Sequence, residues 1–527
     1  MVIKIAFLVL FFAVMITVGF LCRRQADSVH GFVLGGRNVG PWLTAFAYGT
    51  SYFSAVIFIG YAGQFGWKFG ISTTWIGIGN AVIGSLLAWV ILGRRTRLLT
   101  QKLDSKTMPD YFGTRFGSGA LRIAASAIVF IFLIPYTASL YNGLSRLFES
   151  AFGIDYVWCV IIMSVLTGVY VIAGGYMATA VNDFIQGLIM LVGIVLVIGA
   201  VLKDNGGFMQ AMSSLSVIES SAAPGLKGAF ASFLGPEPVA LLGVVLLTSL
   251  GTWGLPQMVG KFYAIKSESD ISKGTLISTL FAIVVAGGCY FLGGFGRLYG
   301  NVIEYGANGN PVYDSIVPKM LEGLPTAVVS IVIVLVLSAS MSTLSSLVLT
   351  SSSTLTLDMI LPIRSKAGKK TEQKTQMLLI RSLIVFFIAV SAVIAIVQVK
   401  SSVTFIAQLM GISWGALAGA FLAPFLYSLY GKWVTKASVW VSFVCGVGIM
   451  AADMFCNFTG RVFINAFFAS PINAGVLAMV AGLVIVPVVS LFTPRPDGKK
   501  VDDMFSCYDR TVVVHATTAL GEEQKEN

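Results

Sequence analysis

The residues best suited to chemistry in this chain are hydroxyl side chains that follow a purely apolar stretch. Residues 331–337 are all isoleucine, valine or leucine, and residues 339–346 then hold five serines and threonines. Hydroxyl and carbonyl oxygens are the ligands that a hard cation such as sodium prefers. In a helix that turns about 100° per residue, one face would carry Ala339, Ser342, Thr343 and Ser346, with Ser345 beside it.

A second reading of the same hydroxyls needs no ion. Serine and threonine side chains in membrane helices often donate back to a carbonyl of the preceding turn. The segment alone does not separate this packing role from cation binding, so both interpretations stay open here.

The composition places these residues in a membrane. Of 527 residues, 56% are hydrophobic and 11% charged, against about 25% charged in soluble domains. We therefore expect one polytopic, all-α membrane protein. The predicted spans lie at 3–22, 41–66, 71–93, 120–148, 156–175, 178–202, 231–258, 275–300, 325–357, 377–398, 404–427, 437–457 and 471–492.

Basic residues predict the orientation. If the amino terminus lies outside, most of the 35 Lys and Arg fall in inner segments, with Lys261 among the inner-loop residues. This bias follows the positive-inside rule and explains the net charge of +11 without a nucleic-acid partner. We expect a multi-pass protein of the cell (inner) membrane, in contact with the lipid bilayer, with its carboxyl terminus in the cytoplasm.

Ionisable residues within spans are functional candidates because each is costly there. Asp183 opens the predicted span 178–202, where it could instead cap the helix amino terminus. Asp358 ends the span 325–357, where we expect solvent to reach it. No histidine, cysteine or carboxylate cluster resembles a catalytic constellation, so we expect no enzyme activity.

Two spans contain helix breakers. Residues 48–55 (YGTSYFSA) and 248–256 (TSLGTWGLP) put glycine, proline and hydroxyl residues at mid-membrane. Such breaks free backbone groups for ligands. They begin two successive five-span blocks, 41–202 and 231–427, and matching broken helices in two halves are typical of inverted-repeat secondary transporters.

The chain resembles the sodium:solute symporter family, and most closely its bacterial sodium/proline branch. The resemblance covers nearly all of residues 31–430. It rests on 35–41 (GGRNVGP), 108–112 (MPDYF), 145–150 (SRLFES), 174–187, 341–345 (MSTLS) and 413–416 (SWGA), in this order and spacing.

The resemblance implies the LeuT-type fold of two inverted five-helix repeats. One helix would be added in front and two behind, giving about thirteen membrane helices. The implied parts are 1–30 (extra helix and loop), 31–205 (first repeat), 206–430 (second repeat), 431–492 (two extra helices) and 493–527 (cytoplasmic tail). We expect the monomer to function alone.

The resemblance also implies binding residues for sodium. One sodium site would use carbonyls and hydroxyls of Thr50, Phe53, Ala339, Ser342 and Thr343. A second site, present in some members, would match Asp183, Ser342, Ser345 and Ser346.

The expected solute cavity is lined by Ser54, Tyr136, Thr248, Thr252, Trp253 and Gln408. Thr248 and Thr252 replace a tryptophan and a tyrosine of proline transporters, and Tyr52 replaces an aspartate, which argues against proline. Tyr136 stands where sialic-acid carriers have arginine, which argues against an acid sugar.

These expectations combine into one function. The chain would import a small polar solute, amino-acid-like or a small carboxylate, by sodium-coupled alternating access. The alternative is a proton-coupled symporter of the same fold that uses Asp183.

Overall fold

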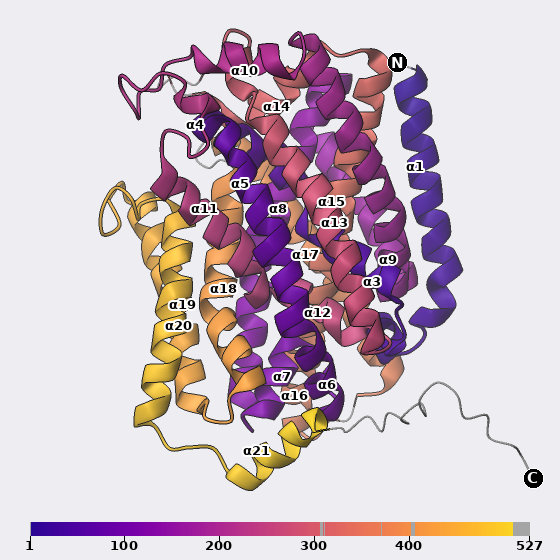
Figure 1. Cartoon of the computed structure of the whole chain (residues 1–527). Helices are drawn as coiled ribbons and strands as arrows, with labels where there is room; N and C mark the ends of the chain where they lie inside the picture. The colour runs from indigo at the N-terminus through magenta and orange to yellow at the C-terminus, as the bar shows by residue number, and fades with distance from the viewer. Residues whose placement is uncertain (1, 306–308, 310, 370, 402–405, 510–527) are drawn as a thin grey trace, which may run out of the picture.

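The apolar stretches form a bundle of roughly parallel helices (Figure 1). This computed structural model describes residues 2–305, 309, 311–369, 371–401 and 406–509. The described part of the chain contains no β-strand. The long helices are α1 (Val2–Leu21), α8 (Gly119–Phe152), α9 (Tyr156–Asp204), α13 (Ser269–Gly293), α15 (Thr326–Thr354), α17 (Gln373–Ser401), α18 (Ile406–Tyr430), α19 (Lys436–Phe458) and α20 (Pro471–Phe492).

Shorter helices complete the spans and the connections. They are α2 (Val29–Leu34), α3 (Pro41–Tyr52), α4 (Ala62–Phe69), α5 (Thr74–Gly79), α6 (Arg94–Lys102), α7 (Met108–Arg115), α10 (Phe208–Ser216), α11 (Pro238–Leu250), α12 (Pro256–Ala264), α14 (Tyr313–Glu322), α16 (Leu361–Lys366) and α21 (Gly498–Phe505). Turns of π-helix continue several of them at η3 (Val56–Tyr61), η5 (Asn80–Leu87), η6 (Trp89–Gly93) and η10 (Leu355–Ile360).

The number of spanning helices depends on how bent helices are counted. Within the described residues, ten helices are long and apolar enough to cross a membrane, and the bent pair α11–α12 adds an eleventh. Two of the ten each join two predicted spans: Tyr156–Asp204 contains 156–175 and 178–202, and Val56–Lys102 contains 71–93 and the end of 41–66. Every predicted span overlaps a helix, although 404 and 405 of the span 404–427 lie outside the described residues.

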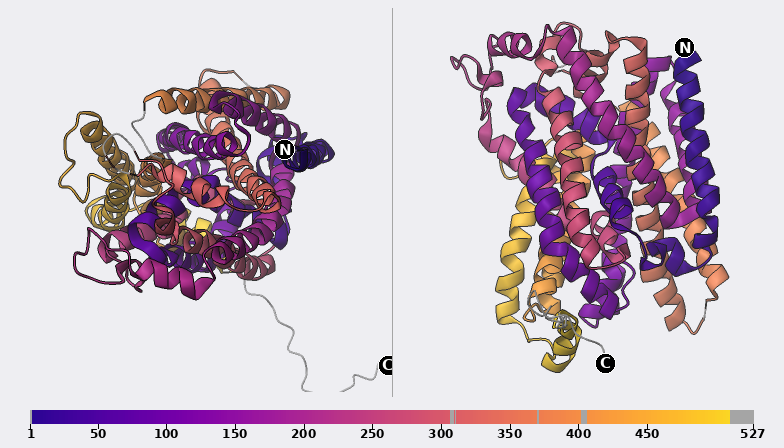
Figure 2. Two further views of the ribbon diagram at one scale, coloured as in Figure 1. Left: turned by 90° about the horizontal axis from the view of Figure 1, so that it is seen from above. Right: turned by 45° about the vertical axis from the view of Figure 1, so that its right-hand side comes forward.

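Burial separates central from peripheral helices. In its most apolar window, α18 is 89% buried and the helix that contains α15 is 78% buried, against 22% for α1 and 33% for α19 and α20. Seen from above, α1 and the α19–α20 pair occupy opposite edges of the bundle (Figure 2). This is the arrangement expected if one helix is added in front of the repeats and two behind. Its outer helices expose apolar side chains that suit lipid.

Asp358 lies just beyond the end of α15 and is buried, so the expectation that solvent reaches it is wrong. Its side chain is fully buried in η10, where it accepts hydrogen bonds from Thr107 Oγ1 at 2.5 Å and from Arg122 Nε at 2.9 Å. Arg122 also pairs with Asp110 at 3.2 Å. Solvent does not reach this acid, because α7 and the start of α8 cover it and are thereby fixed to the end of α15.

Part of the predicted tail is a helix that lies across the end of the bundle opposite the start of α1 (Figure 1). The Phe505 side chain of α21 is 6% exposed, and the Arg115 guanidinium lies 5.3 Å from its ring centroid. Lys432 and Lys102 pair with neighbouring aspartates of α21 at 2.6 and 3.0 Å. Residues 510–527 of the tail lie outside the described residues.

Gly175 creates the kink that divides α9, and it gives a first prediction. Its φ of 55° and ψ of −146° are open only to glycine, and a Cβ there would lie 2.9 Å from the Phe32 carbonyl oxygen. We expect Gly175→Ala to lower the free energy of unfolding by about 1–3 kcal/mol, measured by SDS titration in mixed micelles. Gly199→Ala in the same helix is the control, because a Cβ at Gly199 meets nothing within 4 Å. Equal stability of the two variants would contradict the prediction.

Candidate ion and solute site

The predicted break after residue 48 is present and frees the carbonyls of α3. The helix ends at Tyr52, Phe53 is extended at φ −101° and ψ 94°, and η3 begins three residues later. A helix leaves the carbonyls of its last turn without N–H partners from its own backbone. The carbonyl of Thr50 belongs to this turn, so it is available to a neighbouring helix or a ligand.

Four oxygens of the first predicted ion site meet where α3 contacts α15. Ser342 Oγ and Thr343 Oγ1 each lie 3.2 Å from the Thr50 carbonyl oxygen. The same hydroxyls lie 3.2 and 3.1 Å from the carbonyl oxygen of Ala339. Thr50, Ser342 and Thr343 are fully buried, and Ala339 is 1% exposed. The two hydroxyls therefore stand between carbonyls of two different helices.

These contacts are compatible with both interpretations of the α15 hydroxyls, packing within the helix and binding of a cation. The bonds to Ala339 are the back-bonds of the packing interpretation, and those to Thr50 come from the broken helix. Ser340 shows back-bonding alone, because its hydroxyl donates only to Val336 at 2.8 Å. Phe53 stands at the break with its ring stacked on Tyr52 at 4.3 Å, and no described hydrogen bond joins its carbonyl to Ser342 or Thr343.

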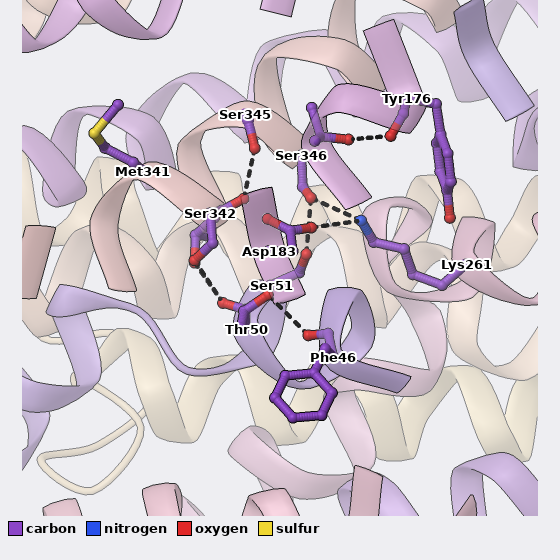
Figure 3. Close-up of polar contacts among 12 residues, drawn as sticks. Phe46, Thr50, Ser51, Tyr176, Asp183, Lys261, Met341, Ser342, Ser345 and Ser346 are labelled. Atoms are coloured by element: carbon purple, nitrogen blue, oxygen red, sulfur yellow. Dashed lines mark hydrogen bonds and ion pairs between the residues drawn. The ribbon is translucent and has the colours of Figure 1, made fainter. Parts of the chain in front are cut away.

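The second predicted site holds a lysine. Asp183 is fully buried, and its Oδ2 lies 3.7 Å from Lys261 Nζ. Lys261 Nζ also donates to Ser346 Oγ at 2.9 Å, and Ser346 Oγ lies 2.7 Å from Ser51 Oγ (Figure 3). Ser345 takes no part, since its hydroxyl donates to the Ser342 carbonyl at 2.9 Å. Of the predicted ligands, the structure thus brings Asp183 and Ser346 together, around an ammonium group.

For these charged residues, one alternative and one expectation are wrong. The alternative of a helix cap at Asp183 fails, because α9 continues on both sides of it and its break lies two turns earlier, at Gly175. Lys261 is no inner-loop residue, because it lies in α12 with its side chain 4% exposed. The bend of 47° between α11 and α12 directs the second half of this span back into the bundle.

The predicted solute residues of the second broken span are bonded to residues of η5. Thr248 Oγ1 donates to Asn80 Oδ1 at 2.9 Å. Thr252 Oγ1 lies 3.5 Å from the Gly84 carbonyl, and Trp253 Nε1 donates to the Ile83 carbonyl at 3.0 Å. The α11–α12 break therefore lies against η5, and Thr248 and Thr252 belong to one buried polar cluster.

Other predicted solute residues keep unbonded polar atoms. Ser54 Oγ and Tyr136 Oη are buried and have no hydrogen-bond partner among the described residues. Tyr136 meets the indole of Trp414 edge-on, with ring centroids 6.0 Å apart. Gln408 is half-buried near the start of the described part of α18, and none of the hydrogen bonds between described residues joins it to these groups.

Sequence reasoning gave no solute-binding role to Asn80, Ser249 or Trp414, which lie in this cluster. Asn80 Oδ1 also accepts from Ser249 Oγ at 3.0 Å, while Asn80 Nδ2 and Trp414 Nε1 have no partner among the described residues. Tyr52 Oη donates to the Thr248 carbonyl at 2.5 Å, beside the break. A lone asparagine within an apolar span was a signal that could have identified Asn80.

Comparison with known proteins decides the family, because the sodium:solute symporter family matches residues 32–446. The chain belongs to the sodium:solute symporter family. Similar proteins include the osmoregulated proline transporter OpuE of Bacillus subtilis (strain 168), 28% identical over 92% of this chain and 94% of the relative. A sodium/proline symporter of Staphylococcus aureus (strain JH9) is also 28% identical, over 92% of each chain.

A solved structure agrees on the fold. A substrate-bound, outward-open Na+-coupled sialic acid symporter superposes with a TM-score of 0.71 and 17% identity, over 94% of this chain and 99% of that one. The fold is accordingly the LeuT-type helical bundle. As a member of the sodium:solute symporter family, the chain is a multi-pass membrane transporter of a solute together with sodium.

Proposed function

We propose that this symporter imports a small polar solute, either amino-acid-like or a small carboxylate, with sodium bound between α3 and α15. The observation that carries the proposal is the meeting of two α15 hydroxyls with the carbonyl freed by the α3 break, within 3.2 Å. Their fully buried position suits a dehydrated sodium ion, since hydroxyl and carbonyl dipoles replace its water. Thr50, Ala339, Ser342 and Thr343 would hold the ion, with Phe53 at the edge of the site.

The proposed solute site is the polar cluster beside both helix breaks. Its groups with unbonded atoms are hydroxyls, one amide and one indole, and none of them is charged. Such groups suit a neutral or zwitterionic solute, and a carboxylate could bind N–H groups at a half-helix amino terminus. We assign solute contacts to Ser54, Tyr136, Thr248, Thr252 and Asn80, and only a lining role to Trp253 and Gln408.

The proposed mechanism couples the ion to the two halves of the bundle. Sodium would bridge α3, in one moving unit, to α15, in the other, and so stabilise the outward-open arrangement. Its loss to the cytoplasm would weaken this bridge and favour the inward-open arrangement, because a ligand shifts an equilibrium by its differential affinity for the two states.

We place the amino terminus outside, the carboxyl terminus in the cytoplasm, the repeats at 31–205 and 206–430, and transport in the monomer.

The coupling ion is tested in proteoliposomes at fixed membrane potential and equal pH on both sides. Radiolabelled proline is the first solute to assay, because the names of similar proteins include it, followed by other amino acids and short carboxylates. We expect uptake under an inward sodium gradient and none when potassium replaces sodium. Sodium-independent uptake that follows an imposed pH gradient would instead support proton coupling through Asp183.

Asn80 gives a second prediction, on solute affinity. We expect Asn80→Ala to raise the solute concentration for half-maximal uptake about tenfold, because the unbonded Asn80 Nδ2 would no longer be available to donate to the solute. Sodium binding should stay unchanged. Ser85→Ala is the control, since Ser85 lies in the same η5 segment but pairs with Ser278 at 2.8 Å. Equal effects of the two variants would remove Asn80 from the solute site.

A further inference from the structure

The side chain of Lys261 occupies the place that resemblance assigns to a second sodium ion. Its ammonium is 2.9 Å from Ser346 Oγ and 3.7 Å from Asp183 Oδ2, and Lys261, Ser346 and Asp183 are 4%, 3% and 0% exposed. Ser346 and Asp183 are two of the predicted ligands of that ion. A charged amine inside a membrane bundle is costly unless paired, so its burial at this point requires the acid beside it.

The charges of this cluster already balance. Figure 3 shows Lys261 Nζ directed between Asp183 and Ser346, with Ser51 beyond. Tyr176 flanks the amine, with its ring centroid 5.4 Å from Nζ. Asp183 is the acid of this group, and its single negative charge faces a single positive one. A sodium ion bound to the same oxygens would lie a few ångström from the ammonium and would be repelled by it.

The ammonium also borders a small cavity. This space of about 50 Å³ is lined by Lys261 and Ser346, by Gln257 and Ser353, and by Lys106 and Thr107 of the segment before α7. No acid is among the described residues that line it. The cavity therefore offers no second carboxylate that could hold a cation after displacement of the lysine.

We propose that Lys261 serves as a built-in cation in place of a second sodium, so that one sodium ion accompanies each solute. The ammonium supplies the charge that a second sodium would bring, and it links α12 to α9 and α15 without exchange with solvent. This inference rests on the proposed function, because it assumes that the first site between α3 and α15 binds sodium. It revises the predicted second site, whose remaining ligands become partners of the lysine.

The test counts sodium ions bound to the purified full-length chain by equilibrium dialysis with radioactive sodium, without added solute. We expect one ion per wild-type chain. Lys261→Met removes the charge while keeping much of the volume, so Asp183 should recruit a second ion and the count should rise to two. Lys261→Arg, which keeps the charge, should bind one ion. The double variant Lys261→Met with Asp183→Asn should also bind one.

The counts test the built-in cation and the sodium site between α3 and α15 separately. A wild-type count of two ions, which needs no variant, would overturn the built-in cation. A count of one for folded Lys261→Met would overturn it as well. A wild-type count of zero would instead contradict the proposed sodium site between α3 and α15. Size-exclusion chromatography of each sample establishes that the counted protein is folded.

Discussion

Thr343→Ala should raise the sodium concentration for half-maximal binding about ten- to a hundredfold. The substitution removes one of the two hydroxyls that lie 3.2 Å from the Thr50 carbonyl. An interaction with a charged partner contributes about 1.5–3 kcal/mol, and each 1.4 kcal/mol corresponds to a factor of about ten. Sodium titration of the purified chain, followed by tryptophan fluorescence or by thermal shift, measures the change. Ser342→Ala should act in the same direction.

Ser340→Ala is the matched control for Thr343→Ala. Ser340 lies on the same helix and is 1% exposed, but its hydroxyl donates only to the Val336 carbonyl of its own helix. If the two substitutions change sodium affinity equally, the hydroxyls of α15 serve only packing. The proposed ion site would then be wrong.

Lys261→Met should destabilise the protein in sodium-free buffer by about 3–5 kcal/mol, the usual effect of removing one partner from a buried ion pair. The reason is that Asp183, fully buried, would keep its charge without a counter-ion. The double variant with Asp183→Asn should recover most of this loss, because neither charge remains. Unfolding by SDS in mixed micelles, for the wild type, both single variants and the double variant, gives the coupling free energy.

Added sodium separates two possible causes of this destabilisation, the unpaired charge of Asp183 and the lost packing of Lys261. If the loss reflects an unpaired acid, added sodium should stabilise Lys261→Met more than the wild type, since binding to the folded state alone raises its stability. Potassium at equal ionic strength is the control for screening. A double variant no more stable than Lys261→Met would show that the lysine acts by packing and not by charge.

Local features of the sequence predicted the two segments that meet between α3 and α15, and sodium binding by these segments stays a prediction. Hydroxyl spacing fixes which face of α15 is polar, and Gly49 and the small residues after it favour a break in α3. Both signals depend on neighbours within two helical turns, where side-chain direction follows from helical geometry. Resemblance to the family then supplied the pairing of these two distant segments.

Features that depend on distant segments were not predictable in this way. Lys261 lies near other lysines in sequence, and its approach to Asp183 depends on how α12 packs after the 47° bend. Asp358 looked accessible because its partner Arg122 lies 236 residues away. Asn80 carries no charge, so a search for ionisable residues in spans passed over it. In each case the information lies in how helices pack, which residue spacing does not determine.

A fixed Lys261 ammonium in place of a second sodium would set a thermodynamic ceiling on how far the solute can be concentrated. Each cation that crosses a potential of 100 mV releases about 2.3 kcal/mol, which corresponds to about a 50-fold concentration ratio before the chemical gradient of sodium is added. A carrier with two mobile ions squares that ratio. A carrier whose second cation never leaves is limited to the unsquared ratio.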